Sequence, residues 1–159
     1  MFVNLKVGNI KDNYHFDKRV GQGTFGVVYQ ATNRLTLQKV AIKAIVYSDL
    51  TNHKQFINEC NIMIKLDHPN IANIFEIWEW DNLLFLVMDF YEGGELYEYL
   101  KRRGYLEEFE VFKVMKQMVS VLIYLQENNI SHKDLKLENF LLKEKDDLSN
   151  IKVADFGLS

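Results

Sequence analysis

The chain has 159 residues, a formal net charge of −3, 48% hydrophobic residues and 26% charged residues. These values are typical of one globular domain or part of a larger one, and they argue against a nucleic-acid-binding protein that works through bulk positive charge. The single cysteine excludes an internal disulfide, and the longest apolar run, Leu83 to Met88, is too short to span a bilayer, so we expect a soluble cytoplasmic protein without a membrane partner.

A glycine-rich stretch, Gly21-Gln22-Gly23-Thr24-Phe25-Gly26, lies between β-branched and aromatic residues, which predicts two strands joined by a turn. A dinucleotide-binding fingerprint has the same glycine spacing, but it requires a helix directly after the third glycine, and Val27-Val28-Tyr29 favours a strand. Glycines at a hairpin tip allow backbone N–H groups to approach phosphate oxygens. We therefore expect a phosphate-binding loop, with a plain flexible hairpin as the alternative.

The next predicted strand, Val40 to Ile45, carries Lys43 among Val, Ala and Ile residues. An ammonium group there needs an anionic partner unless it reaches the edge of the sheet. Residues 54–66 predict an amphipathic helix, and Glu59 falls on its apolar stripe instead of the opposite face. We expect Lys43 to pair with Glu59; a surface lysine on an edge strand is the alternative.

Two further strands, Ile71 to Trp80 and Leu83 to Phe90, complete a small predicted sheet, after which the pattern becomes helical. A short helix, Leu96 to Arg103, and a long one, Glu107 to Asn128, are expected. The apolar face predicted for the long helix consists of Phe112, Met115, Val119, Leu122 and Leu125. This change predicts two lobes with a hinge at Asp89 to Gly94, and a cleft between lobes is a common place for a small-molecule site.

The most polar stretch is His132-Lys133-Asp134-Leu135-Lys136-Leu137-Glu138-Asn139, directly before the apolar run Phe140 to Leu142. A solvated turn between a helix and a strand would explain it. However, a hairpin of Phe140 to Leu142 with Ile151 to Ala154 would present Asn139 at one end and Asp155 at the other. An amide and a carboxylate of this kind suit Mg²⁺ when phosphates supply further ligands.

The order of these motifs, ending in Asp155-Phe156-Gly157, resembles that of the eukaryotic protein kinase family. The resemblance implies an α+β, protein-kinase-like fold. Residues 14–90 would form an N-terminal lobe with a five-stranded antiparallel sheet and one main helix. An extension of residues 1–13 would precede this lobe, and residues 91–159 would be the first part of a helical C-terminal lobe, so that 14–159 is a partial kinase domain.

The resemblance also implies roles for individual residues in an ATP- and Mg²⁺-dependent reaction. Lys43 would bind the α- and β-phosphates and pair with Glu59, Asp134 would accept the proton of the substrate hydroxyl, and Lys136 would steady the γ-phosphate. Asn139 and Asp155 would hold Mg²⁺. The residues implied to contact ATP are Gly21, Gln22, Gly23, Thr24, Phe25, Gly26, Val28, Ala41, Lys43, Met88, Asp89, Tyr91, Glu95, Leu141 and Asp155.

Finer features indicate a subgroup and a substrate preference. Lys136 favours Ser/Thr over Tyr substrates, and the stretches 66–71, 93–96 and 155–159 look most like the calcium/calmodulin-dependent and calcium-dependent kinases. No EF-hand loop occurs, so calcium regulation is not encoded in this chain. Glu95 and Glu138 match positions that face arginines upstream of the phosphorylated residue in basic-directed kinases; solvated glutamates are the alternative.

The sequence also departs from the family pattern. Lys133 stands where the family usually has Arg, and a lysine cannot form the bidentate contact by which that Arg clamps a phosphorylated activation loop. The sequence stops two residues after Gly157. If the chain is complete as given, we expect exposed apolar area on the long helix, reduced stability and little or no phosphate transfer to proteins. The alternative function is then a nucleotide-binding or docking module without catalysis.

Overall fold

The computed structural model describes residues 5–23, 26–46, 57, 60–61, 63–132 and 134–154. The chain forms two compact units. The first comprises Met1–Leu66 and Asn73–Phe90, and the second comprises Asp67–Ala72 and Tyr91–Ser159. No helix in the described part of the chain is long and apolar enough to cross a membrane.

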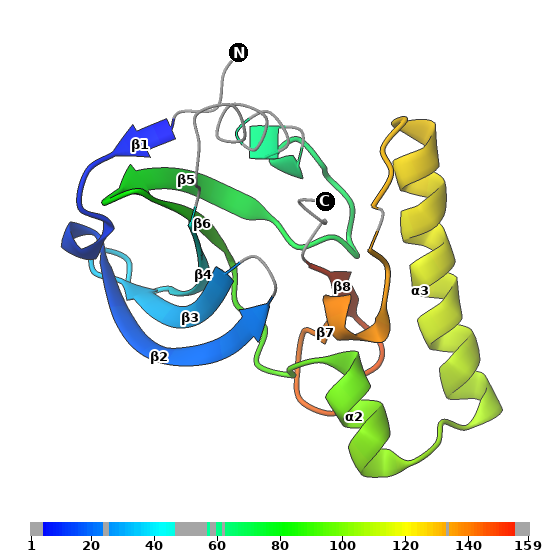
Figure 1. Ribbon diagram of the computed structural model, residues 1–159. Coiled ribbons are helices and arrows are strands. Elements are labelled where there is room, and N and C mark those ends of the chain that lie inside the picture. Colours follow the sequence, from blue (N-terminus) through cyan, green and yellow to red (C-terminus); the bar gives the residue numbers. More distant parts are fainter. Residues whose placement is uncertain are drawn as a thin grey trace. The chain divides into compact units, whose positions relative to one another are not determined.

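The first unit is built around a six-stranded sheet with the strand order β1-β5-β6-β4-β3-β2 (Figure 1). Its strands are β1 (Leu5–Val7), β2 (Tyr14–Gly23), β3 (Gly26–Asn33), β4 (Lys39–Val46), β5 (Ile74–Trp80) and β6 (Leu83–Asp89). Successive strands from β2 to β4 pair in antiparallel register, as do β4 with β6 and β5 with β6. The predicted strands are confirmed with small changes at their ends.

The prediction of a five-stranded, purely antiparallel sheet is wrong at one edge. Strand β1 adds a sixth strand parallel to β5, with Leu5 opposite Ile77 and Val7 opposite Glu79. A short 3₁₀ helix, Ile10–Asp12, connects it to β2. The sequence signal was too weak because β1 has only three residues, and its partner strand lies about 70 positions further along the chain.

The hydrophobic core of the first unit lies on one face of the sheet. Phe16 packs edge-on against Tyr29 and Phe85, with ring centroids 5.3 and 6.3 Å apart. The buried members of this core are Ile10, Tyr14, Ala31, Val40, Ile42, Trp78, Phe85 and Val87. Because side chains alternate along a strand, the neighbours of these residues in β3, β4 and β6 point to the opposite face. Of the predicted nucleotide-contacting residues, Val28, Ala41, Lys43 and Met88 lie on that second face.

The predicted helix over residues 54–66 falls partly outside the described residues. Within it, Ile64 donates its backbone N–H to the Cys60 carbonyl at 3.0 Å, which is the spacing of an α-helical turn. Cys60 is fully buried. Glu59 lies outside the described residues, so the predicted pairing of Glu59 with Lys43 stays a prediction.

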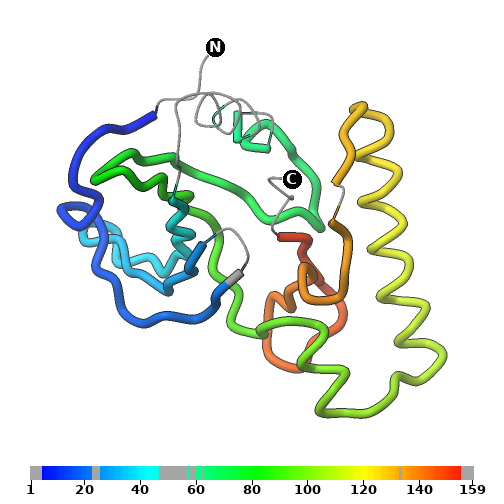
Figure 2. The backbone as a smooth tube through the Cα atoms, viewed as in Figure 1, coloured from blue at the N-terminus to red at the C-terminus, as the bar shows by residue number. Residues whose placement is uncertain are grey.

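The second unit contains two helices and a small hairpin. Helix α2 spans Leu96–Arg103, helix α3 spans Glu108–Glu127, and strands β7 (Phe140–Leu142) and β8 (Ile151–Val153) pair antiparallel (Figure 2). A short 3₁₀ helix, Leu137–Asn139, leads directly into β7. The predicted ends of α2 are confirmed, with Gly104 at φ +88° closing the helix, and those of α3 agree to within one residue.

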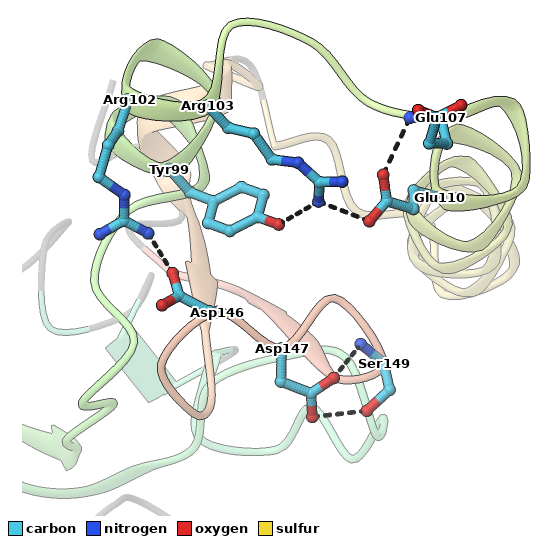
Figure 3. A network of polar contacts seen from close by, with 8 residues as sticks. All are labelled: Tyr99, Arg102, Arg103, Glu107, Glu110, Asp146, Asp147 and Ser149. Carbon is cyan, nitrogen blue, oxygen red and sulfur yellow. Dashed lines mark hydrogen bonds and ion pairs between the residues drawn. The ribbon is translucent and has the colours of Figure 1, made fainter.

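Polar contacts join α2, α3 and the β7–β8 loop (Figure 3). Arg103 Nη1 donates to the Tyr99 hydroxyl and to Glu110 Oε1, each at 2.6 Å. Arg102 forms an ion pair with Asp146 of the loop. These contacts place the α2–α3 connection and the loop in a defined arrangement within the second unit.

The apolar face predicted for the long helix is not the buried one. Phe112, Met115, Val119 and Leu122 are exposed, with Phe112 at 69%, whereas the fully buried helix residues are Val114, Val121 and Leu125. Leu125 alone is shared by the two sets. Since α3 carries apolar residues around most of its circumference, periodicity could not decide which side packs.

Residues 67–72 belong to the second unit, although the sequence placed them with the first lobe. Three side chains of α3 bind this segment. The Tyr124 hydroxyl accepts from the Asp67 N–H at 2.9 Å, and Ser120 Oγ lies 3.0 Å from His68 Nε2. Gln117 Oε1 accepts from Asn70 Nδ2 at 2.9 Å.

Candidate functional site

In the first unit, the register of the sheet aligns several predicted site residues in one row. Gly21 lies opposite Val28, Val28 opposite Lys43, and Lys43 opposite Leu86. Directly opposed residues project from the same face of a sheet. The side chains of Val28 and Lys43 therefore point to the same face of the sheet, opposite the hydrophobic core. Gly21 lies beside them in the same row.

Lys43 lies in the middle of the sheet, since β4 is flanked by β3 on one side and β6 on the other. Its residue exposure is only 3%. The alternative of a surface lysine on an edge strand is therefore wrong. Burying an ammonium group among apolar residues is costly unless polar or anionic groups compensate its charge. This position of Lys43 therefore suits a lysine that binds an anion.

The third glycine of the glycine-rich stretch is required by close packing. A Cβ atom on Gly26 would lie 2.0 Å from the Ala44 carbonyl oxygen, and this backbone atom cannot move aside easily. A Cβ on Gly21 would meet only Val28 Cβ, at 3.8 Å. Gly23 and Gly26 pair at the end of the β2–β3 ladder, with Gln22 opposite Val27. Thr24 and Phe25 lie outside the described residues.

Two predicted ATP-contacting residues, Ala41 and Met88, also share this face. Ala41 lies opposite Met88, and both are two positions along their strands from the Lys43–Leu86 pair. Asp89 lies opposite Val40, so its side chain belongs to the other face. There the Asp89 carboxylate accepts from Asn73 Nδ2 at 3.0 Å. The sheet thus brings together Val28, Ala41 and Met88 but not the Asp89 side chain.

In the second unit, the polar stretch folds into a loop whose groups converge on Asp134. Lys136 Nζ donates to Asp134 Oδ2 at 2.8 Å, and Asn139 Nδ2 donates to the Asp134 backbone oxygen at 2.6 Å. The Asp134 N–H donates to the carbonyl of His132, which is buried. The loop holds three charged or polar side chains within contact distance of one another, and the Asp134 and Lys136 side chains remain partly exposed to solvent.

The electrostatics of the loop keep Asp134 ionised. The hydrogen bond from Lys136 lowers the pKa of the Asp134 carboxyl below its ordinary value, and the contact with Asn139 acts in the same direction. Asn139 is 6% exposed, and its carbonyl accepts from the Ala154 N–H at 2.8 Å. The loop is thereby tied to the strand end that precedes Asp155. Lys133 and Asp155 themselves lie outside the described residues.

Two more predicted site residues, Glu95 and Leu141, meet in an isolated antiparallel bridge. The Leu142 N–H donates to the Gly94 carbonyl at 2.8 Å. Burial raises the pKa of Glu95, and the charges of Glu98 and Glu138 raise it further. Glu95 and Glu138 therefore belong to one negatively charged region. Tyr91, at the start of this segment, is half-buried.

Sequence reasoning missed two residues, Asn70 and Gln117, whose side chains bind the backbone of β8 and of the loop before it. Asn70 Nδ2 donates to the Ile151 carbonyl at 2.9 Å, and Gln117 Oε1 accepts from the Ile151 N–H at 2.8 Å. Gln117 Nε2 also donates to the Leu148 carbonyl at 2.9 Å. No local pattern reveals these bonds, because their partners are separated by 31 to 81 positions.

Comparison with known proteins agrees with this geometry. The sequence model of the family described as "Protein kinase domain" matches residues 14–159. The chain belongs to this family. This kinase domain is 40% identical to "Calcium-dependent protein kinase 3" of Plasmodium yoelii yoelii, over 99% of the chain and 30% of the relative. It is also 40% identical to human "NUAK family SNF1-like kinase 1", over 95% of the chain and 23% of that relative.

Solved structures give the same result for the fold of the kinase domain. A crystal structure of Rad53 1-466 in complex with AMP-PNP has a TM-score of 0.85 and 30% identity, covering 94% of this chain and 40% of that chain. The twitchin kinase fragment of C. elegans has a TM-score of 0.86 and 31% identity, covering 97% and 34%. The predicted family and α+β fold class are confirmed. The chain spans less than a third of the length of the curated relatives named above.

Proposed function

We propose that the protein is a serine/threonine protein kinase that transfers the γ-phosphate of ATP to hydroxyl groups of protein substrates. The observation that carries this proposal is the convergence of Lys136 and Asn139 on Asp134, with Lys136 Nζ 2.8 Å from Asp134 Oδ2. A carboxylate, an ammonium group and an amide in one fixed loop supply the acceptor and the charge that phosphoryl transfer requires.

Asp134 acts as the group that orients the substrate hydroxyl and accepts its proton. Its lowered pKa keeps the carboxylate ionised at neutral pH, so that it can accept a hydrogen bond. A strong base is not needed, because bond formation to the nucleophile is limited in the loose transition state of phosphoryl transfer. Lys136, bound to the same carboxylate, neutralises charge on the γ-phosphate as it is transferred.

Residues of the first unit bind the nucleotide. The backbone around Gly21, Gly23 and Gly26 binds phosphate oxygens, and the Lys43 ammonium binds the α- and β-phosphates. Val28, Ala41 and Met88 provide the apolar contacts for adenine, and their common face supports this assignment. From the second unit, Leu141 contacts adenine and Glu95 contacts the ribose. Tyr91 and the backbone of Asp89, whose side chain lies on the other face of the sheet, complete the adenosine contacts.

The residues that would hold Mg²⁺ are Asn139 and Asp155. Asn139 fits this role, because its Nδ2 is turned to the Asp134 carbonyl and its Oδ1 is therefore the atom that can bind a hard cation. Mg²⁺ would neutralise charge on the phosphate oxygens. The chain's own contribution is to hold Asn139 in place: its backbone carbonyl accepts from the Ala154 N–H, and its Nδ2 donates to the Asp134 carbonyl.

The relatives support the same assignment. The curated relatives are named as kinases, and one structural relative was solved with AMP-PNP, an ATP analogue. A nucleotide-binding or docking module without catalysis is the second candidate, and the exposed apolar residues of α3 favour it if nothing covers them.

Phosphate transfer from [γ-³²P]ATP to a library of Ser, Thr and Tyr peptides by the full-length protein distinguishes the two candidates. We expect Mg²⁺-dependent labelling of Ser and Thr peptides. Nucleotide binding without any labelling would favour the non-catalytic module. Labelling of Tyr peptides alone would contradict the assignment based on Lys136.

We further propose that substrates carry Arg upstream of the phosphorylated residue. The influence of Glu138 on the pKa of Glu95 supports a shared negative region that would attract a guanidinium group. Replacing Arg by Ala in the best peptide should raise KM, and the Glu95→Gln and Glu138→Gln variants should lose most of that preference. An unchanged KM on Arg replacement would contradict the proposal.

A further inference from the structure

Two adjacent glycines follow the first unit, and they are required for different reasons. Gly94 has φ +73°, a conformation that favours glycine, and a Cβ on it would meet no atom within 4 Å. A Cβ on Gly93 would lie 2.4 Å from the Glu144 carbonyl oxygen, 2.5 Å from Leu142 Cβ and 2.5 Å from the Leu142 carbonyl oxygen. Gly94 is therefore favoured by its backbone conformation, whereas Gly93 is required because there is no room for a side chain at that position.

The space at Gly93 cannot be recovered by a side-chain rotation. Two of the three atoms that a Cβ would meet are backbone oxygens, and the third is a Cβ. Ordinary contacts of a Cβ atom begin near 3.4 Å, so a methyl group would have to separate the two segments by about 1 Å. The β7–β8 loop that contains Glu144 is also tied to α2 through the Arg102–Asp146 ion pair, which restricts its movement (Figure 3).

The contact at Gly93 is continuous with two groups assigned to nucleotide binding. Directly after it, the Gly94 carbonyl accepts from the Leu142 N–H at 2.8 Å, and Glu95 forms its bridge with Leu141. Strand β7 also follows Asn139 without a break. A separation of the two segments at Gly93 would consequently move Glu95 relative to Leu141.

We propose that Gly93 is a positioning residue for nucleotide binding: its missing side chain lets residues 93–95 lie against the end of β7 and so sets Leu141 and Glu95 at the distance that adenosine requires. Gly93 acts through Leu141 and Glu95 and does not itself contact ATP or the protein substrate. The inference rests on the proposed function for the roles of Leu141 and Glu95.

The experiment compares Gly93→Ala with Gly104→Ala in the full-length protein. Gly104 closes α2 at φ +88°, with no atom within 4 Å of a Cβ, so its substitution strains a helix end without entering the contact at Gly93. Binding of a fluorescent ATP analogue and the KM for ATP are measured beside Tm. Since a misplacement of about 1 Å in a binding site can cost up to about 100-fold, we expect Gly93→Ala to weaken nucleotide binding roughly 10- to 100-fold. Gly104→Ala should lower Tm and leave nucleotide binding within about twofold of wild type.

Wild-type nucleotide binding by Gly93→Ala, or equal weakening by both variants, would overturn the proposal. If Gly93→Ala does not fold, the test is the hydrogen-exchange rate of the Leu142 backbone N–H in the wild-type protein, measured with and without the ATP analogue. We expect the nucleotide to slow this exchange at least tenfold. An unchanged rate would overturn the proposal. Nucleotide binding that depends on Gly93 in a protein that transfers no phosphate would refute the proposed catalysis and leave this inference standing.

Discussion

Asn70 is predicted to be a principal stabilising residue of the second unit. It is 9% exposed, and its Nδ2 donates to the Ile151 carbonyl and to Gln117 Oε1, each at 2.9 Å. Asn70→Ala removes both bonds and leaves acceptors in a region that water reaches poorly. Two bonds at about 0.5–1.5 kcal/mol each, with about 1 kcal/mol for poorly solvated acceptors, give a loss of roughly 2–4 kcal/mol in the free energy of unfolding.

The two units can be followed by separate signals in urea denaturation. Both tryptophans, Trp78 and Trp80, lie in β5 of the first unit, whereas α2 and α3 of the second unit contribute to circular dichroism at 222 nm. With a slope of about 2 kcal/mol/M, Asn70→Ala should lower the midpoint of the circular dichroism transition by about 1–2 M.

Asn73→Ala is the matched control, because Asn73 is exposed and its bonds to Asp89 lie at the surface. It should cost less than about 1 kcal/mol. A circular dichroism midpoint for Asn70→Ala no lower than that of Asn73→Ala would refute the reasoning that residues 67–72 are held to α3 by Asn70.

Two further predictions concern the first unit. Burial alone would raise the pKa of Glu76, but hydrogen bonds from Lys6, Trp78 and Tyr14 bring it below its ordinary value. The ionised Glu76 therefore stabilises the folded state above about pH 4.5, and this stabilisation is lost as the pH falls through the lower pKa of the folded state. Tryptophan fluorescence should show that Glu76→Gln is less stable than wild type at neutral pH and that the difference shrinks in acid; a constant difference would contradict this. Gly26→Ala should shift the same fluorescence transition to lower urea and weaken ATP binding, because the added Cβ would lie 2.0 Å from the Ala44 carbonyl oxygen. Gly21→Ala is the control: the nearest atom to its Cβ lies 3.8 Å away, so its effect on both measurements should be smaller.

The sequence predicted best those features that depend on local patterns. Strands β2 to β6, the limits of α2 and α3 and the polar loop around Asp134 all follow from alternation, glycine positions and charge within short stretches. The family resemblance rested on the order of such stretches, and it is confirmed by the match over residues 14–159.

Features that depend on distant partners could not be predicted. Strand β1 is defined by its pairing with β5, and residues 67–72 are assigned to the second unit by bonds to Gln117, Ser120 and Tyr124. The buried side of α3 was predicted wrongly, because the helix is apolar on several sides and only its neighbours determine which side packs. The space at Gly93 is likewise set by Leu142 and Glu144, about 50 positions away.

The central claim is that Asp134 orients the attacking hydroxyl in phosphate transfer. The most direct test is the rate of transfer from ATP to a Ser peptide by full-length Asp134→Asn, with ATP affinity measured in parallel. The asparagine keeps the shape of the side chain but accepts a proton poorly, so kcat should fall by about 10²–10⁴-fold while ATP affinity stays within a few-fold of wild type. Phosphate transfer at the wild-type rate by Asp134→Asn would contradict the claim.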